Sequence, residues 1–443
     1  MKREIALHTR REFLRETVLG GALSWTVPTF LANTFAALQA DAADKPSQPA
    51  TGRDSTILVI LQMAGGNDGL NTVVPYGNDH YHQARPRIAI ESSKVLRLND
   101  GLGLHPSLIG FKELYDAGDL TVIQGVGYPN PNRSHFRSTE IWQTASDSNA
   151  FDRYGWLGRY FDNSCPGCDP LIGVSIGRQT PQAFAAKTPT GVSLENPENY
   201  RYLPGGRGNA NEKGSAEEAF RKLNLPESDI TENSGATIEA IPGAVRRPGS
   251  ALDFLERTAL DAQVSSDRIR GIAGRVETKA IYPASPLGNS LKLVANLIGG
   301  GLPTRVFYVS QGGYDTHTNQ TNTQNRLLRE LGESVKAFVA DMKDQGNLSR
   351  VLLMTFSEFG RRVAENASGG TDHGAAAPMF VVGGNTKAGL LGQYPSLAPT
   401  DLFQGDLKFT VDFRSVYAAV LEDWLKTSSE PVLGRKFAPL RFV

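Results

Sequence analysis

Short apolar runs alternate with longer helical patterns along most of this chain, and this alternation restricts its fold more than any other feature. The runs are rich in β-branched residues, which suits buried strands of a parallel sheet. They cover residues 56–62, 120–126, 171–176, 305–310, 350–356 and 379–382. Helical patterns lie around and between them, at residues 106–117, 134–144, 250–276, 289–298, 320–345 and 413–425. Strands that alternate with helices predict an α/β fold with a largely parallel central sheet and helices on both faces.

Composition divides the chain into few parts. Residues 44–54 are polar and rich in proline, which is typical of a linker. Residues from about 180 to about 248 carry many Pro, Gly, Asn and Glu residues and few apolar runs. We therefore predict a single domain over residues 55–443 with an irregular insertion at 180–248.

The 46 basic residues balance the 46 acidic ones, so charge gives no argument for a nucleic-acid partner.

The first residues have the order of a twin-arginine export signal. Arg10 and Arg11 precede a weakly apolar segment at residues 18–31, and small residues follow it. That segment is shorter than the roughly 20 residues of a membrane-spanning helix. We expect a signal peptide over residues 1–43 and the twin-arginine export machinery as a partner. The product would be a periplasmic or otherwise exported protein without a stable membrane anchor.

Polar clusters follow the predicted strands at several places. The candidate side chains are, in chain order, Asp68, Arg133, Ser134, Arg137, Asp315, His317, Glu358 and His373. Ligands of a doubly wound sheet bind beyond the carboxyl ends of its strands, so these side chains are expected to converge. Carboxylates and imidazoles are ligands of divalent cations. Asp315 and His317 lie two residues apart, so both can reach one metal if that segment is extended.

Ser134 has two interpretations that do not exclude each other. It precedes the helical pattern at 134–144, where a serine hydroxyl often caps the first backbone N–H groups. A serine nucleophile at the same position would act beside a helix N-terminus that favours phosphate or sulfate. Arg133 and Arg137 would add positive charge for the oxygens of such an anion. The acids and histidines have structural alternatives as well, as helix caps or as side chains satisfied in turns.

Several longer passages resemble the bacterial exported family known as domain of unknown function 1501 (DUF1501). They are LVILQMAGGNDGLNTVVPY, GVGYPNPNRSHFRSTEIWQT, VFYVSQGGYDTHTNQ, LLMTFSEFGRRVAENASGGTDHGAAAPMFVVGG and LKFTVDFRSVYAAVLEDWL. The resemblance covers nearly the whole chain after the predicted signal. It implies the alkaline-phosphatase-like superfamily, which includes sulfatases and phosphate-transferring mutases. That superfamily combines an acid after the first strand, a nucleophile at a helix start, and acids and histidines that hold two metals.

The resemblance implies a role for each matching position. Asp68 is similar to the first-strand acid, and Ser134 to the nucleophile. Asp315 and His317 resemble the acid–histidine element, with one residue between them instead of three. Glu358 stands where an Asp-His pair is expected. The residue that follows it, Phe359, replaces the histidine, and His373 resembles the last histidine.

Two functions follow from this reading. The first is a metal-dependent hydrolase or transferase that acts on a phosphate or sulfate ester, its substrate a small anionic ester or a glycan derivative. It would use Ser134 and one divalent metal (zinc, manganese or calcium), with a second metal as an alternative. The second is a non-catalytic envelope protein that binds a glycan, an anionic ligand or a partner. Phe359 and the shortened Asp315–His317 spacing favour the second.

The remaining candidates are interpreted as structural. Cys165 and Cys168 have the spacing of a redox motif without its usual context, so a small structural disulfide or free thiols are expected. His80, His82 and His105 lie among polar or turn residues and are taken as structural too.

Overall fold

The computed structural model describes residues 55–165, 168–188, 191–197 and 268–443. The predicted signal, the linker, and most of the insertion and of the helix expected at 250–276 lie outside the described residues. The chain divides into two compact units, one of residues 41–196 and 271–443 and the other of residues 1–40 and 197–270. The first unit contains nearly all described residues, and only this unit is considered below.

A nine-stranded sheet forms the centre of this unit, in the order β13-β5-β12-β9-β1-β8-β6-β7, with β14 also paired to β5. Its strands are β1 (Ile57–Met63), β5 (Leu120–Gly127), β6 (Gly173–Ile176), β7 (Val192–Leu194), β8 (Val306–Gln311), β9 (Val351–Phe356), β12 (Ala377–Gly383), β13 (Gly389–Leu391) and β14 (Val411–Asp412). All six predicted strands are confirmed, as β1, β5, β6, β8, β9 and β12. The short edge strand β7 lies in the segment that the sequence reading assigned to irregular chain.

The sheet is mixed but mostly parallel, as predicted. The central strand β1 is parallel to both of its neighbours, with Leu58 opposite Val306 of β8 and Leu352 of β9. All seven residues of β1 are buried, which explains why its sequence is apolar at six of the seven positions rather than alternating. Only β12 runs the other way, antiparallel to both β5 and β9. Its first residues therefore lie at the edge where its neighbours end.

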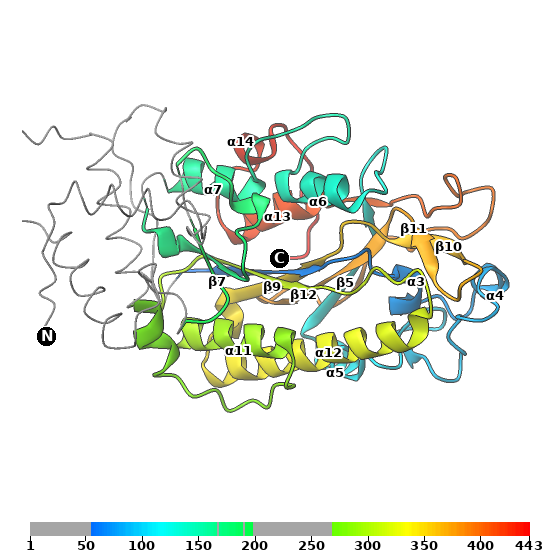
Figure 1. The fold of residues 1–443 in the computed structure, drawn as a ribbon, viewed down its shortest axis with the longest axis horizontal. Helices are drawn as coiled ribbons and strands as arrows, with labels where there is room; N and C mark the ends of the chain where they lie inside the picture. Colours follow the sequence, from blue (N-terminus) through cyan, green and yellow to red (C-terminus); the bar gives the residue numbers. More distant parts are fainter. Residues whose placement is uncertain (1–54, 166–167, 189–190, 198–267) are drawn as a thin grey trace, which may run out of the picture. The chain divides into compact units, whose positions relative to one another are not determined.

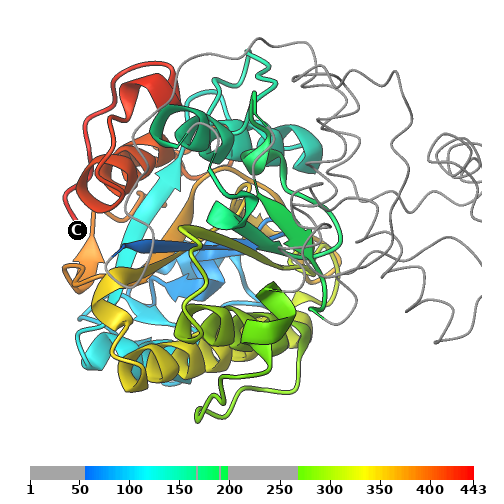
Figure 2. The same ribbon diagram turned by 90° about the vertical axis from the view of Figure 1, so that its left-hand side faces the viewer.

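Helices cover both faces of the sheet, as Figures 1 and 2 show from two directions. One face carries α5 (Ile109–Asp116), α11 (Pro286–Gly299) and α12 (Gln320–Asp344). The other carries α6 (His135–Thr144), α7 (Trp156–Ser164) and α13 (Phe413–Ala419), which continues as the π-helical turn η5 (Val420–Trp424). Trp142 of α6 stacks on Phe356 of β9 and on Phe413 of α13, so aromatic rings join this layer to the sheet.

The remaining elements are short. They are α3 (Gly69–Thr72), α4 (Asp79–Ala84), α14 (Glu430–Leu433), η2 (Pro170–Ile172), η3 (Gln182–Phe184), η4 (Leu348–Arg350), a three-stranded sheet of β2 (Val73–Val74), β4 (Gly103–Leu104) and β3 (Leu96–Arg97), and a hairpin of β10 (Arg361–Glu365) and β11 (Thr371–His373). Cys165 and Cys168 form a disulfide, one of the two states expected for them. Among the described residues, no helix has the length and apolar character needed to span a membrane.

Candidate metal centre

Three predicted strands direct their following residues to one edge of the sheet. His135 begins α6 after β5, Asp315 and His317 follow β8, and Glu358 follows β9. His373 ends β11, four residues before β12 begins. Because β12 is antiparallel to its neighbours, the chain that enters it comes from the same edge. Figure 1 shows β10, β11 and α3 together at that end of the sheet.

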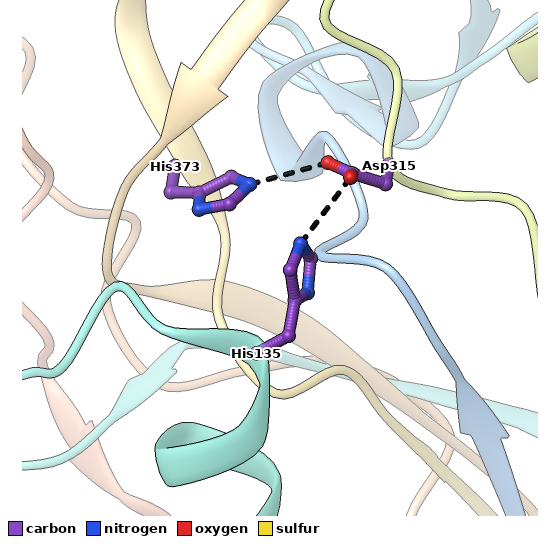
Figure 3. A group of neighbouring side chains, drawn as sticks. All are labelled: His135, Asp315 and His373. Carbon is purple, nitrogen blue, oxygen red and sulfur yellow. Dashed lines mark hydrogen bonds and ion pairs between the residues drawn. The ribbon is translucent and has the colours of Figure 1, made fainter.

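Three imidazoles and one carboxylate meet there, and we call His135, Asp315, His317 and His373 the His–Asp cluster. Asp315 Oδ1 lies 3.1 Å from His373 Nε2 and 3.1 Å from His317 Nε2. Asp315 Oδ2 lies 3.4 Å from His135 Nε2. The Nε2 atoms of His317 and His373 are 2.9 Å apart. Figure 3 shows His135 and His373 pointing at the Asp315 carboxylate from two different elements.

Each imidazole of the cluster is held from behind through its Nδ1 atom. His135 Nδ1 lies 2.8 Å from Glu358 Oε1, and His317 Nδ1 lies 3.2 Å from Asp372 Oδ1. His373 Nδ1 lies 2.7 Å from the backbone oxygen of residue 133. Carboxylates and carbonyls only accept hydrogen bonds, so all three Nδ1 atoms carry a proton. In the neutral rings the three Nε2 atoms are therefore unprotonated. All three face Asp315, and those of His317 and His373 also face each other.

This arrangement fits a divalent cation. His135 Nε2 is buried and has no hydrogen-bond partner among the described residues. Metal-binding histidines typically donate their other ring N–H to a carboxylate or carbonyl, as all three rings do here. Ligands of a tetrahedral zinc ion with bonds of about 2.0–2.1 Å lie roughly 3.3 Å apart, close to the 2.9, 3.1 and 3.4 Å separations of the cluster. His135, Asp315 and His373 can offer one ligand atom each within 4.8 Å of one another.

Arg361 fixes the charge state of the cluster carboxylate. Burial alone would raise the pKa of Asp315, but the hydrogen bond and the charge of Arg361 lower it to about 2. Arg361 Nη2 lies 2.9 Å from Asp315 Oδ1, while the buried guanidinium also donates to backbone oxygens of Gly66 and Thr371. Partial burial has the opposite effect on an imidazole, and it lowers the pKa of His373 below its ordinary value. The aspartate is thus ionised near neutral pH, and burial helps to keep His373 unprotonated there.

Glu358 lies behind His135 rather than inside the cluster. Its Oε1 accepts hydrogen bonds from His135 Nδ1 and from the backbone N–H of Gly65, both at 2.8 Å. Trp142 Nε1 donates to its backbone oxygen at 2.8 Å. The Phe359 ring packs against the His135 and His373 rings, with centroids 4.9 and 4.6 Å apart. Glu358 is therefore placed to set the orientation of His135, although the sequence predicted it as a metal ligand.

Asp68 has its own partners, outside the His–Asp cluster. Its carboxylate lies 2.6 Å from Arg85 Nη1, and both side chains are buried. Gln320 Nε2 donates to the same carboxylate, which also accepts the backbone N–H of Asn71 as the cap of α3. Asp68 thus contacts a fixed cation, the guanidinium of Arg85. These contacts occupy both carboxylate oxygens in a structural network.

Ser134 and the two arginines of its motif differ in their surroundings. Ser134 is exposed and occupies the N-cap position of α6, but its hydroxyl makes no capping hydrogen bond. Arg133 is ion-paired with Asp406 at 2.6 Å. Arg137 donates to backbone oxygens of residues 147, 148 and 150 and pairs with Glu140 at 2.8 Å, so its contacts lie away from the cluster.

His135 is the residue that sequence reasoning missed. It directly follows Ser134. The sequence pattern predicts a role for the Ser134 hydroxyl, as a cap or a nucleophile, and none for the neighbouring imidazole. The usable signal was its position: it is a histidine in the polar segment that follows a predicted strand, as His317 is. His135 also brings an imidazole beside Phe359, the position where the sequence pattern lacks one.

A family model described as protein of unknown function (DUF1501) matches residues 55–434. The chain belongs to the DUF1501 family. This confirms the family that the sequence passages resemble. A search of curated proteins found no match.

Several solved structures are similar to this DUF1501 chain. An alkaline phosphatase superfamily protein from Vibrio parahaemolyticus has 9% identity and a TM-score of 0.35, with 92% of this chain and 77% of that chain covered. The lipoteichoic acid synthase LtaP from Listeria monocytogenes has 9% identity and a TM-score of 0.33, with coverages of 93% and 79%. The C-terminal periplasmic domain of EptC from Escherichia coli, in complex with Zn, has 8% identity and a TM-score of 0.33, with coverages of 76% and 78%. Similarities this distant assign no activity to the chain.

Proposed function

We propose that this DUF1501 protein binds one divalent cation, zinc by preference, through His135, Asp315, His317 and His373. The observation that carries the proposal is the set of three Nδ1-anchored imidazoles whose Nε2 atoms face one carboxylate. Three nitrogen ligands suit zinc better than calcium, which takes oxygen ligands. The Asp68 carboxylate is paired with Arg85, which favours one metal over two.

We infer further that the site, in a protein that the sequence predicts to be exported, hydrolyses or transfers a phosphate or sulfate ester. A cation at the cluster would supply Lewis acidity and stabilise negative charge on the ester oxygens. The Ser134 hydroxyl, free of a capping bond and next to His135, is the proposed nucleophile. It would form a bond to phosphorus or sulfur as the alcohol leaves. Water or an acceptor alcohol would then release the group from the serine.

Replacing Ser134 tests the nucleophile. Ser134→Ala should lower turnover of aryl phosphates or aryl sulfates by roughly 100-fold or more, because no hydroxyl remains to form the covalent bond. Zinc content should not change, since the serine is not among the proposed ligands. The matched control is Thr139→Ala, which removes a hydroxyl further along α6. Equal turnover by wild type and Ser134→Ala would exclude the serine mechanism. A zinc-loaded wild type with no turnover on the whole panel would instead support the binding role.

The pH dependence of zinc affinity tests the ligand set. Protons compete with the metal for imidazole nitrogen, so affinity should fall as the pH is lowered. His373 should keep its nitrogen free for the metal below the ordinary titration range of histidine, because burial lowers its pKa. Asp315, with a pKa of about 2, should stay ionised throughout. Competition with a chromogenic chelator from pH 8 to pH 5 measures the effect, with circular dichroism to verify folding. An affinity that does not change over this range would contradict imidazole ligation.

A further inference from the structure

A polar cavity of about 260 Å³ lies beside the His–Asp cluster. It is lined by Pro131, Asn132, Arg133, Phe403, Gln404 and Asp406. Arg133 belongs to both places, because its backbone oxygen accepts the hydrogen bond from His373 Nδ1 while its side chain lines the cavity. Ser134, the proposed nucleophile, is the next residue along the chain. A molecule that reacts at the cluster can therefore extend into this cavity.

One wall of the cavity is a tight turn of the chain. Phe403 and Asp406 exchange two backbone hydrogen bonds of 3.0 Å, and the two residues between them have φ angles of 53° at Gln404 and 88° at Gly405. Two successive positive φ angles are the mark of a tight hairpin turn. The N–H of Val363 in β10 also donates to the backbone oxygen of Gly405 at 3.3 Å. The turn therefore presents Phe403 and Gln404 in a defined place.

The turn also fixes the arginine on the opposite wall. The Asp406 side chain is buried, and its Oδ2 accepts hydrogen bonds from Arg133 Nε at 2.9 Å and Nη2 at 2.6 Å. Arg362 Nε lies 3.7 Å from the other carboxylate oxygen. The Arg133 guanidinium is thus oriented before any ligand arrives. Its Nη1 has no hydrogen-bond partner among the described residues and remains available to a ligand.

The lining groups favour a neutral ligand with many hydroxyl groups. Arg133 and Asp406 neutralise each other, so the lining carries no net charge that would require an anion. The guanidinium of Arg133 and the carboxamides of Asn132 and Gln404 supply donors and acceptors for hydroxyl groups. Phe403, whose surface is 46% exposed, offers an apolar face. The volume is slightly below the 300–1,000 Å³ typical of sites for drug-sized ligands, which suits a single ring.

We propose that this cavity binds a sugar ring, the alcohol portion of the phosphate or sulfate ester that reacts at the cluster. The inference rests on the proposed function for the reaction, but binding of the sugar itself does not depend on it. Phe403 contacts the ring face, and Arg133, Asn132 and Gln404 contact its hydroxyl groups. Asp406 is a positioning residue that acts through Arg133.

The test separates sugar binding from the reaction by using two measurements. Saturation-transfer NMR with glucose, galactose, mannose and N-acetylglucosamine reports binding alone. Wild type should bind at least one of them, and Phe403→Ala should weaken that binding about tenfold through loss of the aromatic face. Phe151→Ala, which removes an exposed ring outside the cavity, should leave it unchanged. No signal from any of the four sugars, or equal affinity in Phe403→Ala, would overturn the proposal. If acetate binds and none of the four sugars does, the proposal is wrong and the cavity is a site for an anion.

Turnover provides the second measurement. For hexose phosphates and sulfates, kcat/KM should fall about tenfold in Phe403→Ala. For para-nitrophenyl phosphate and sulfate, which lack the sugar, it should stay within about twofold. An equal loss on both substrate classes would count against a sugar site. If wild type hydrolyses neither class, the proposed reaction is wrong. The NMR measurement still tests whether the cavity binds a sugar.

Discussion

Removing the imidazole of His135 is expected to abolish stoichiometric zinc binding while the protein remains folded. His135 Nε2 is buried without a hydrogen-bond partner among the described residues, so no other group there replaces it toward a cation. Loss of a group that merely supports a ligand typically costs 10–100-fold in metal affinity, and loss of the ligand itself should cost at least roughly 100-fold. Elemental analysis after dialysis and competition with a chelator measure the change in His135→Ala.

Two further variants make that result specific. His80→Ala removes an exposed imidazole of α4 and should leave the zinc content at one per chain. Glu358→Gln keeps an acceptor near His135 Nδ1 but removes its charge, so it should weaken zinc binding by roughly tenfold. Full zinc binding by His135→Ala would show that this histidine is no ligand. An effect of Glu358→Gln as large as that of His135→Ala would identify the glutamate as a ligand after all.

Asp68→Asn should destabilise the protein by about 3–5 kcal/mol and leave its zinc content unchanged. Asp68 and Arg85 form a buried ion pair at 2.6 Å, with side chains 1% and 0% exposed. Removing one charge leaves the other buried and uncompensated, which is the costly way to break such a pair. Chemical denaturation in the presence of a chelator measures the free energy of unfolding of the metal-free protein, so that zinc loss cannot imitate the effect.

The matched control for this experiment is a surface pair. Glu91→Gln breaks the ion pair with Lys94, whose side chains are 65% and 61% exposed, and should cost no more than about 1 kcal/mol. If Asp68 instead held a second metal, wild type would carry two metals per chain. Asp68→Asn would then reduce the content to one and destabilise the metal-free protein much less. That outcome would restore the two-metal site that the superfamily resemblance implies.

Much of the site could be predicted because strand ends can be read from sequence. The apolar runs of β1, β8 and β9 are nearly continuous, since almost all residues of these strands are buried. Asp315 and His317 therefore stood out as polar residues in the segment that follows a buried strand. The ends of parallel strands meet at one edge whatever the detailed packing. His373 reaches the same edge because β12 runs antiparallel to its neighbours. The apolar run at 379–382 did not reveal that direction.

Local sequence determined which segments become strands and helices, because burial and periodicity act over neighbouring residues. It also determined the family and the edge of the sheet where the chemistry lies. Tertiary structure alone decided the partner of each polar side chain: Arg85 for Asp68, Glu358 behind His135, and Asp406 for Arg133. Two of these pairs join residues more than two hundred positions apart in the chain. Whether a carboxylate meets a guanidinium, an imidazole or a metal depends on which loops fold together, and no local pattern records that.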